Sequence, residues 1–369
     1  MKNYLKHHRM RITALSPVYI GSGDIIGKKE YIYLRHKNLV IIPDMQKMYK
    51  ELLMRHRNEF TKFMMWNSKM KMTDWLKSMG YREADFRRWA LYELDAGDVL
   101  LKGDDPGEKR PFEIHGFTKD PYGLPYVPGS SVKGALRTAL LAYEITRNSD
   151  KYRSDKNSVY NATERSADRV SRTRYLSNEV KDLESRAFNT LNRKQDRPKD
   201  AVNSNMSGLI ISDSMPAGLD DLTLCQKVDY HVDGSARTLP LFYEALKPGT
   251  KIEFDITIDS SLCPYTIGEI NEAVYIFQKI CYERYYSAFG RGTDKEGTMW
   301  LGGNTGFITK TVIYPLMKEN GYITADNVLK ATIGKNYKIH KHTQNRSLRL
   351  APHICKCTYY NNELYDMGM

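Results

Sequence analysis

Two separate stretches of the chain show the alternation of apolar and polar residues that is typical of β-strands, and each comes with one long helical pattern. In the first half, strand patterns at about 9–23 and 28–43 are followed by a helical pattern from Ser131 to about Arg147. In the second half, strand patterns between about 208 and 259 precede a helical pattern that begins at about Thr266. This order predicts an α+β fold of two units, each an antiparallel sheet with helices on one face.

Between these patterns lie two stretches of different character. Helical periodicity dominates from about 44 to 101, which predicts a helical insertion. The stretch 148–205 is rich in charges of both signs and poor in large apolar residues, so we expect a flexible or partly helical segment whose charges face solvent rather than RNA. Further expectations are hairpins turning at 36–38 and 247–250, a strand in "FITKTVIYPL" from Phe307, a short helix near 325–332, and a last strand at 354–360.

The charge balance points to a polyanionic partner. The 369 residues carry 56 Lys and Arg against 44 Asp and Glu, a net charge of +12, and such a basic chain favours nucleic acid over an anionic membrane surface. No apolar run reaches transmembrane length, and the basic N-terminal stretch does not read as a signal peptide. Five scattered cysteines indicate a reducing compartment rather than a disulfide framework. We therefore expect a cytoplasmic protein.

The segment "VPGSSVKGALRTALL" from Val127 to Leu141 suggests a phosphate-binding helix start. Pro128 and Gly129 form a turn, and Ser130 or Ser131 could cap the first helical amides. At 100° per residue, the apolar residues fall on one arc, whereas Lys133, Gly134 and Arg137 fall on the other. A helix N-terminus attracts phosphate, and a mid-helix glycine costs roughly 1 kcal/mol. A capped, solvated helix with an incidental glycine explains the same residues equally well.

Two glycine-rich segments offer similar chemistry. "FGRGTDKEGTMWLGGNTGF" is neither a P-loop nor a dinucleotide-binding fingerprint, because it follows a helix and lacks the closing Gly-Lys-Ser/Thr. Bare main chain beside cations could instead lie along a sugar-phosphate backbone. An ordinary mobile surface loop is the alternative. "SPVYIGSGDIIGKK" repeats the pattern at a strand edge. The candidate RNA-binding residues in these two segments are Arg291, Gly302, Gly303, Gly306, Gly21, Gly23, Lys28 and Lys29. Those in the helix segment are Ser130, Ser131, Lys133, Gly134 and Arg137.

The chain shows no convincing catalytic or metal-binding set. Hydrolase signatures are absent from the sequence. "PHICKC" brings His353, Cys355 and Cys357 together, and His340 and His342 precede it, but this spacing differs from the paired clusters of zinc sites. We therefore predict no catalytic residues, no metal and no cofactor.

Taken together, "SPVYIGSGD", "VPGSSVKGALRTALL", "YEALKPGTKIEFDI" and "LGGNTGF" occur in the order seen in the RAMP superfamily of CRISPR effector proteins. The combination is most similar to the type III-A (Csm complex) subunit that caps the 3′ end of the crRNA. This resemblance implies two ferredoxin-like domains of the RNA-recognition type. We expect them at 1–205, with the helical insertion and the charged segment, and at 206–369, with the glycine-rich loop.

The resemblance also implies a function and partners. These are crRNA binding and maturation in antiviral defence, and contacts with a backbone RAMP subunit, a small helical subunit and a trimming nuclease. Lys133, Arg137 and the loop around Gly302, Gly303 and Gly306 would then meet the RNA backbone by shape and charge. Two alternatives stay open. One is a RAMP-type endoribonuclease using His8, Asp24 or Glu30, and the other is a protein-interaction scaffold whose charge serves solubility.

Overall fold

The computed structural model describes residues 4–66, 70–96, 113–164, 175–333 and 348–369. Its smaller sheet contains β1 (Leu5–Thr13), β10 (Lys251–Asp259) and β7 (Leu209–Ile211) in the antiparallel order β1-β10-β7. Along β1 the exposed residues alternate with less exposed ones, as the sequence predicts for a strand with one covered face. This sheet thus combines one strand of the expected first unit, β1, with two strands of the expected second unit, β7 and β10.

The larger sheet is mixed. Its main path runs β2-β6-β9-β8-β5-β4-β3, and a hairpin of β11 and β12 joins it through β8. The pairs β6–β9 and β5–β8 are parallel, and the others are antiparallel. The strands are β2 (Gly21–Ile26), β3 (Ile32–Leu34), β4 (Leu39–Pro43), β5 (Ala90–Asp95), β6 (Ile114–Phe117), β8 (Leu222–His231), β9 (Ala236–Leu246), β11 (Ile354–Tyr360) and β12 (Glu363–Asp366).

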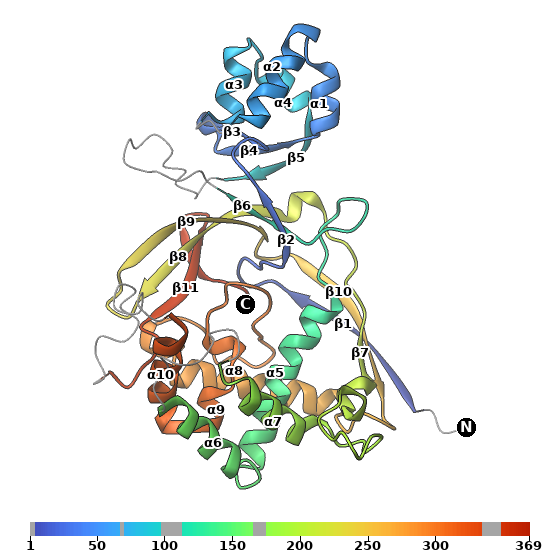
Figure 1. Ribbon diagram of the computed structural model, residues 1–369, viewed down its shortest axis with the longest axis vertical. Coiled ribbons are helices and arrows are strands. Elements are labelled where there is room, and N and C mark those ends of the chain that lie inside the picture. The colour runs from blue at the N-terminus through green and yellow to red at the C-terminus, as the bar shows by residue number, and fades with distance from the viewer. Residues whose placement is uncertain (1–3, 67–69, 97–112, 165–174, 334–347) are drawn as a thin grey trace.

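The α+β class is therefore confirmed: the chain forms curled sheets, with one group of helices below them and another above them in Figure 1. Strands from both sides of residue 205 share each sheet, since β1 pairs with β10 and β6 pairs with β9. The sheets do not divide at that position. Two ferredoxin-like domains with boundaries at 1–205 and 206–369 stay a prediction.

Helices α5 (Gly129–Arg147) and α8 (Ile267–Arg284) form the principal helical layer. Their buried side chains join the core residues of the smaller sheet, for example Leu136 and Ile270 with Phe254. Around them lie α6 (Arg153–Glu164), α7 (Ser177–Phe188), α9 (Ile313–Met317) and α10 (Gly321–Ile333), gathered at the lower end in Figure 1. Burial of these apolar faces, at about 25 cal/mol per Å², drives the packing.

Two local predictions in the second half were wrong. The turn at 247–250 links β9 to β10, but these strands lie in different sheets and form no hairpin. "FITKTVIYPL" is not a strand: a 3₁₀ turn (Ile308–Lys310) precedes α9, and Pro315 sits in the first turn of α9, where its missing N–H is not needed. The hairpin at 36–38 and the strand at Ile354–Tyr360 are confirmed.

The expected helical insertion forms a separate unit at the upper end in Figure 1. It contains α1 (Met45–Glu51), α2 (Met54–Met65), α3 (Met72–Ser78) and α4 (Glu83–Arg88), which share a core with β3 and β4. The helical prediction was wrong at its end, because residues 90–95 form β5 and the alternating side chains there bury Leu94. Residues 97–101 lie outside the described part.

The charged segment 148–205 is partly helical where it is described, because α6 and α7 fall within it. Asp155 of α6, almost fully buried, pairs with Arg186 of α7 at 2.7 Å. None of the helices in the described residues is both long and apolar enough to span a bilayer.

Candidate nucleic-acid interface

The start of α5 is held by a carboxylate instead of a serine. The backbone N–H of Gly129 donates to Asp213 Oδ1 at 2.8 Å, and neither Ser130 nor Ser131 caps the helix. The serine cap was therefore a wrong prediction. Gly129 is required here, since a Cβ would lie 2.2 Å from the carbonyl oxygen of Ile211 at the end of β7. The two serine hydroxyls make no hydrogen bond within the described chain and remain available to a ligand.

A groove of about 360 Å³ runs along the first turns of α5. One wall is the polar, small-residue face of the helix, and the other combines the entry to β2 with the glycine loop and the 3₁₀ turn at 308–310. Its lining includes six residues named from the sequence: Gly21, Ser130, Ser131, Gly134, Gly302 and Gly303. It also includes Ile20, Ala135, Thr138, Thr309 and Lys310. The three glycine-bearing motifs thus meet at one place.

The glycine loop packs closely on the chain that leads into β2. Gly303 N–H donates to the carbonyl oxygen of Tyr19 at 2.7 Å. A Cβ on Gly302 would lie 2.3 Å from that same oxygen, and Gly302 has a φ of +86°. These glycines therefore have a structural role first: they let two main-chain segments touch and so form the groove wall.

Gly134 is different, because no contact with the described residues requires a glycine there. A Cβ there would meet no atom within 4 Å, and the residue is exposed in the middle of the α5 face that lines the groove. A glycine with open space around it, at a position where alanine would stabilise the helix, fits an approaching main chain from another molecule.

Lys310 is the cation of this groove, and the sequence analysis missed it because it lay in an expected strand. Desolvation by the neighbouring walls lowers its pKa. Lys133 lies one residue from Gly134 and is half-buried; desolvation and the nearby Arg137 guanidinium lower its pKa as well. Neither ammonium pairs with a carboxylate among the described residues, but of the two only Lys310 lines the groove.

The other cations named from the sequence are engaged inside the protein. Arg137 contacts Glu184 of α7 at 3.0 Å and covers the ring of Phe188. Lys29 Nζ donates to carbonyl oxygens at the end of α2, including that of Met64 at 3.2 Å. Arg291 pairs with Asp366 at 3.1 Å. Their side chains build structure, and none of the three lines the groove.

Three further sequence-named residues also lie outside the groove lining. Gly23 has a φ of +93° within β2, where the pairing with β6 shifts register. Gly306, with a φ of +96°, faces the Tyr286 hydroxyl and Lys356. Lys28 stands in the turn after β2, and its carbonyl oxygen accepts from the N–H of Met72.

The residues considered for nuclease chemistry are not assembled. His8 lies on β1 of the smaller sheet, whereas Asp24 lies on β2 of the larger one. Glu30 is bound within its own turn, where its carboxylate accepts from the N–H of Gly27 at 2.7 Å.

A comparison with protein families identifies the superfamily of this chain. The model of the RAMP superfamily matches residues 11–307, and the chain belongs to this superfamily. The resemblance drawn from the sequence motifs is thereby confirmed.

The curated relatives that the chain resembles include Csm5 proteins. The chain is 29% identical to the "CRISPR system Cms protein Csm5" of Mycobacterium tuberculosis, an alignment that covers 100% of this chain and 97% of the relative. It is 26% identical to the Csm5 protein of Streptococcus thermophilus, covering 85% and 82%. The similarity thus extends over both halves of the chain.

Solved structures share the fold. One is a chain of a cryo-EM Csm–crRNA–target RNA ternary complex of a type III-A CRISPR–Cas system, with a TM-score of 0.60 at 20% identity over 99% of this chain and 98% of that one. The other is the crystal structure of T. onnurineus Csm5, with a TM-score of 0.60 at 19% identity over 93% and 99%. At these identities the likeness establishes the fold.

Proposed function

We propose that this protein is a non-catalytic, crRNA-binding subunit of a type III-A CRISPR effector complex, and that it caps the 3′ end of the crRNA. Membership of the RAMP superfamily and full-length similarity to Csm5 proteins support this assignment. A chain of the same fold occurs in a Csm–crRNA–target RNA complex. Its partners would be the crRNA, a backbone RAMP subunit and a small helical subunit in the cytoplasm. Through them it would serve crRNA maturation, with a trimming nuclease, and antiviral defence.

The groove along α5 is the observation that carries the proposal. Its lining offers hydroxyls from Ser130 and Ser131, bare main chain at Gly134, and one ammonium from Lys310. Hydroxyls, backbone N–H groups and lysine are the groups that usually contact phosphate and sugar. The lining presents no row of base-reading amides, so the RNA would be held by shape and charge rather than by sequence.

The assignment of a non-catalytic role rests on the placement of the nuclease candidates. General acid–base catalysis needs its groups within hydrogen-bond reach of one reacting site. His8 and Asp24 stand on different sheets, and Glu30 is tied to the Gly27 N–H. The endoribonuclease alternative therefore has no geometric support among the described residues.

A salt titration tests the RNA-binding part. Affinity of the full chain for single-stranded crRNA repeat should fall steeply with ionic strength, because each phosphate neutralised releases counterions. A flat response would contradict the proposal. Incubation with labelled repeat RNA, with and without divalent metal, tests the non-catalytic part. We expect no defined products, whereas products abolished by Asp24→Ala would show that the chain is a nuclease.

A further inference from the structure

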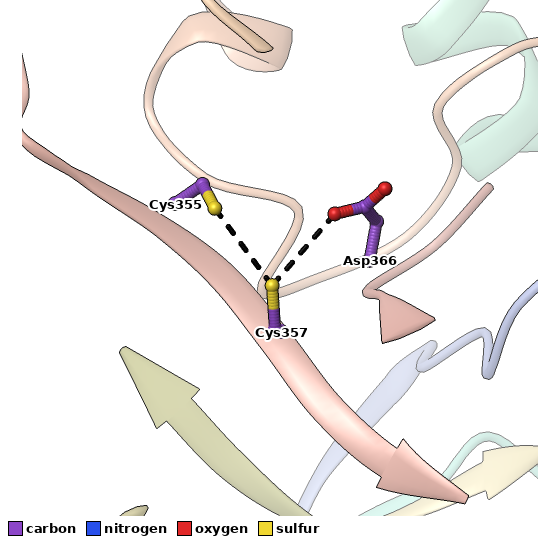
Figure 2. Close-up of side chains that lie close together, drawn as sticks. All are labelled: Cys355, Cys357 and Asp366. Atoms are coloured by element: carbon purple, nitrogen blue, oxygen red, sulfur yellow. Dashed lines mark hydrogen bonds between the residues drawn. The ribbon is translucent and has the colours of Figure 1, made fainter. Parts of the chain in front are cut away.

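Two cysteines and an aspartate form a compact buried cluster at the β11–β12 hairpin. Cys355 and Cys357 are two residues apart on β11 and point to the same side of the strand. Asp366 of β12 is the direct cross-strand partner of Cys357. Sγ of Cys357 lies 3.8 Å from Sγ of Cys355 and 3.7 Å from Oδ1 of Asp366. Figure 2 draws both contacts as dashed lines. All three ligand atoms lie within 4.8 Å of one another.

Two of these three separations match those around one tetrahedral metal ion, and the third pair, Cys355 Sγ and a carboxylate oxygen of Asp366, lies within 4.8 Å. With Zn–S bonds of about 2.3 Å and a Zn–O bond of about 2.0 Å, tetrahedral angles place two sulfurs about 3.8 Å apart and a sulfur and an oxygen about 3.5 Å apart. The observed 3.8 Å and 3.7 Å are close to both values. Two sulfurs and a carboxylate oxygen are ligand types that zinc accepts, whereas calcium and magnesium require oxygen alone.

The charges around the cluster suit a dication. The cysteine side chains are buried, and Asp366 keeps 8% of its surface. Arg291 Nε lies 3.1 Å from Asp366 Oδ1. Two thiolates and one carboxylate would carry three negative charges, and a divalent ion with this guanidinium would carry three positive charges. Burial of such a group is tolerable because it is neutral as a whole.

We propose that Cys355, Cys357 and Asp366 bind one Zn²⁺ ion. On binding, both S–H bonds break, two Zn–S bonds form and two protons pass to solvent, with no change of oxidation state. Water would take the fourth position. This revises the expectation of no metal, which rested on the spacing in "PHICKC" alone. Asp366 could not be assigned from that segment, since only the pairing of β11 with β12 brings it to Cys357.

The ion would tie the C-terminal hairpin to the glycine loop. Asp366 Oδ2 already accepts from the N–H of Gly292 at 2.8 Å. Two residues further on, Gly368 accepts from the N–H of Leu301 at 2.7 Å and donates to the carbonyl oxygen of Pro17 at 2.9 Å. Zinc would thus stabilise the hairpin whose hydrogen bonds hold the chain next to Gly302 and Tyr19. The site itself does not depend on the proposed RNA-binding function.

Metal content of the purified full chain tests the site. After purification without chelators, we expect about one zinc per chain by elemental mass spectrometry. Cys355→Ser with Cys357→Ser should lower the zinc content more than about tenfold. Cys263→Ser, which removes a buried thiol beside Lys133, should leave it unchanged. Wild-type protein that carries no zinc, or equal zinc in the double variant, would overturn the proposal.

Cobalt substitution gives a readout on the wild-type chain, independent of how well the variants fold. Co²⁺ added to zinc-stripped protein should produce thiolate-to-metal charge-transfer absorption and the intense visible bands of a tetrahedral ion. Only the weak spectrum of hexa-aqua Co²⁺ would show that the cluster is an ordinary buried thiol pair. A disulfide between Cys355 and Cys357 in the native protein would equally rule out the metal site.

Discussion

Gly303 donates its backbone N–H to the carbonyl oxygen of Tyr19 at 2.7 Å. This bond joins the glycine loop of the second half to the chain that enters β2 in the first half. The wall of the groove is therefore made by two segments far apart in the sequence, and its shape depends on how closely they can approach.

Gly302→Ala should destabilise the protein by roughly 2–4 kcal/mol, because an L-residue is strained at φ +86° and its Cβ would lie 2.3 Å from Tyr19 O. Gly297→Ala is the matched control: it has a φ of +78° but no atom within 4 Å of the added Cβ. It should cost only about 1–2 kcal/mol. Urea denaturation measures both, and equal losses would show that the close approach to Tyr19 is unimportant.

Gly134→Ala should stabilise the free protein by about 1 kcal/mol, since alanine is the better helix former and meets no neighbour. Gly134→Phe should leave the fold intact but weaken RNA binding by about tenfold or more, because the ring fills the groove. Thr146→Phe, at an exposed position near the other end of α5, should not change RNA binding. Full affinity in Gly134→Phe would exclude the groove as the RNA site.

Lys310→Glu should lower RNA affinity by about tenfold or more and reduce the salt slope by about one, as expected when a phosphate contact is lost. Lys251→Glu changes the net charge equally, but at the exposed start of β10. Binding curves at several salt concentrations compare the two. The same loss in both variants would mean that only the net charge matters.

As the pH is raised, RNA affinity should begin to fall at a lower pH than it would with lysines of ordinary pKa. The pKa values of Lys133 and Lys310 are lowered from 10.5, chiefly by desolvation. Phosphate binding needs the protonated amines, so affinity is present below these lowered pKa values and is lost as the pH rises through them. Lys133→Arg with Lys310→Arg should keep its affinity across this range. If RNA affinity fell over the same pH range in the wild type and in the double arginine variant, this explanation would be contradicted.

Arg137→Gln should cost about 1 kcal/mol of stability through the lost contacts with Glu184 and Phe188. RNA affinity should change less than about threefold, because this guanidinium is held on α7 and lies outside the groove lining. Glu184→Gln should have a similar effect on stability. A loss of affinity as large as that of Lys310→Glu would identify Arg137 as an RNA contact.

Local periodicity was sufficient to predict individual elements. It identified the strand Ile354–Tyr360, the turn at 36–38 and the helix that begins near Ser131. The glycine motifs also marked segments that do meet in space. These successes share one cause: the information lies within a few residues, where side-chain spacing decides which face is buried.

Features that depend on distant partners were not predictable in this way. The turn at 247–250 looks like a hairpin, but it carries the chain from one sheet to the other. Asp213 replaces the expected serine cap because β7 ends beside α5. Arg291 and Lys29 looked like free cations, yet each has partners that only the tertiary fold supplies. Lys310 was missed because its segment was expected to be a strand, and only the tertiary fold brings it to the groove along α5.

The most direct test of the central claim is photo-crosslinking of the full chain to crRNA that contains 4-thiouridine, followed by mass spectrometry of the linked peptides. We expect crosslinks at 19–21, 130–138 and 302–310, the three segments that line the groove. Crosslinks confined to α6, α7 or the helical unit of α1–α4, with none in those three segments, would contradict the account.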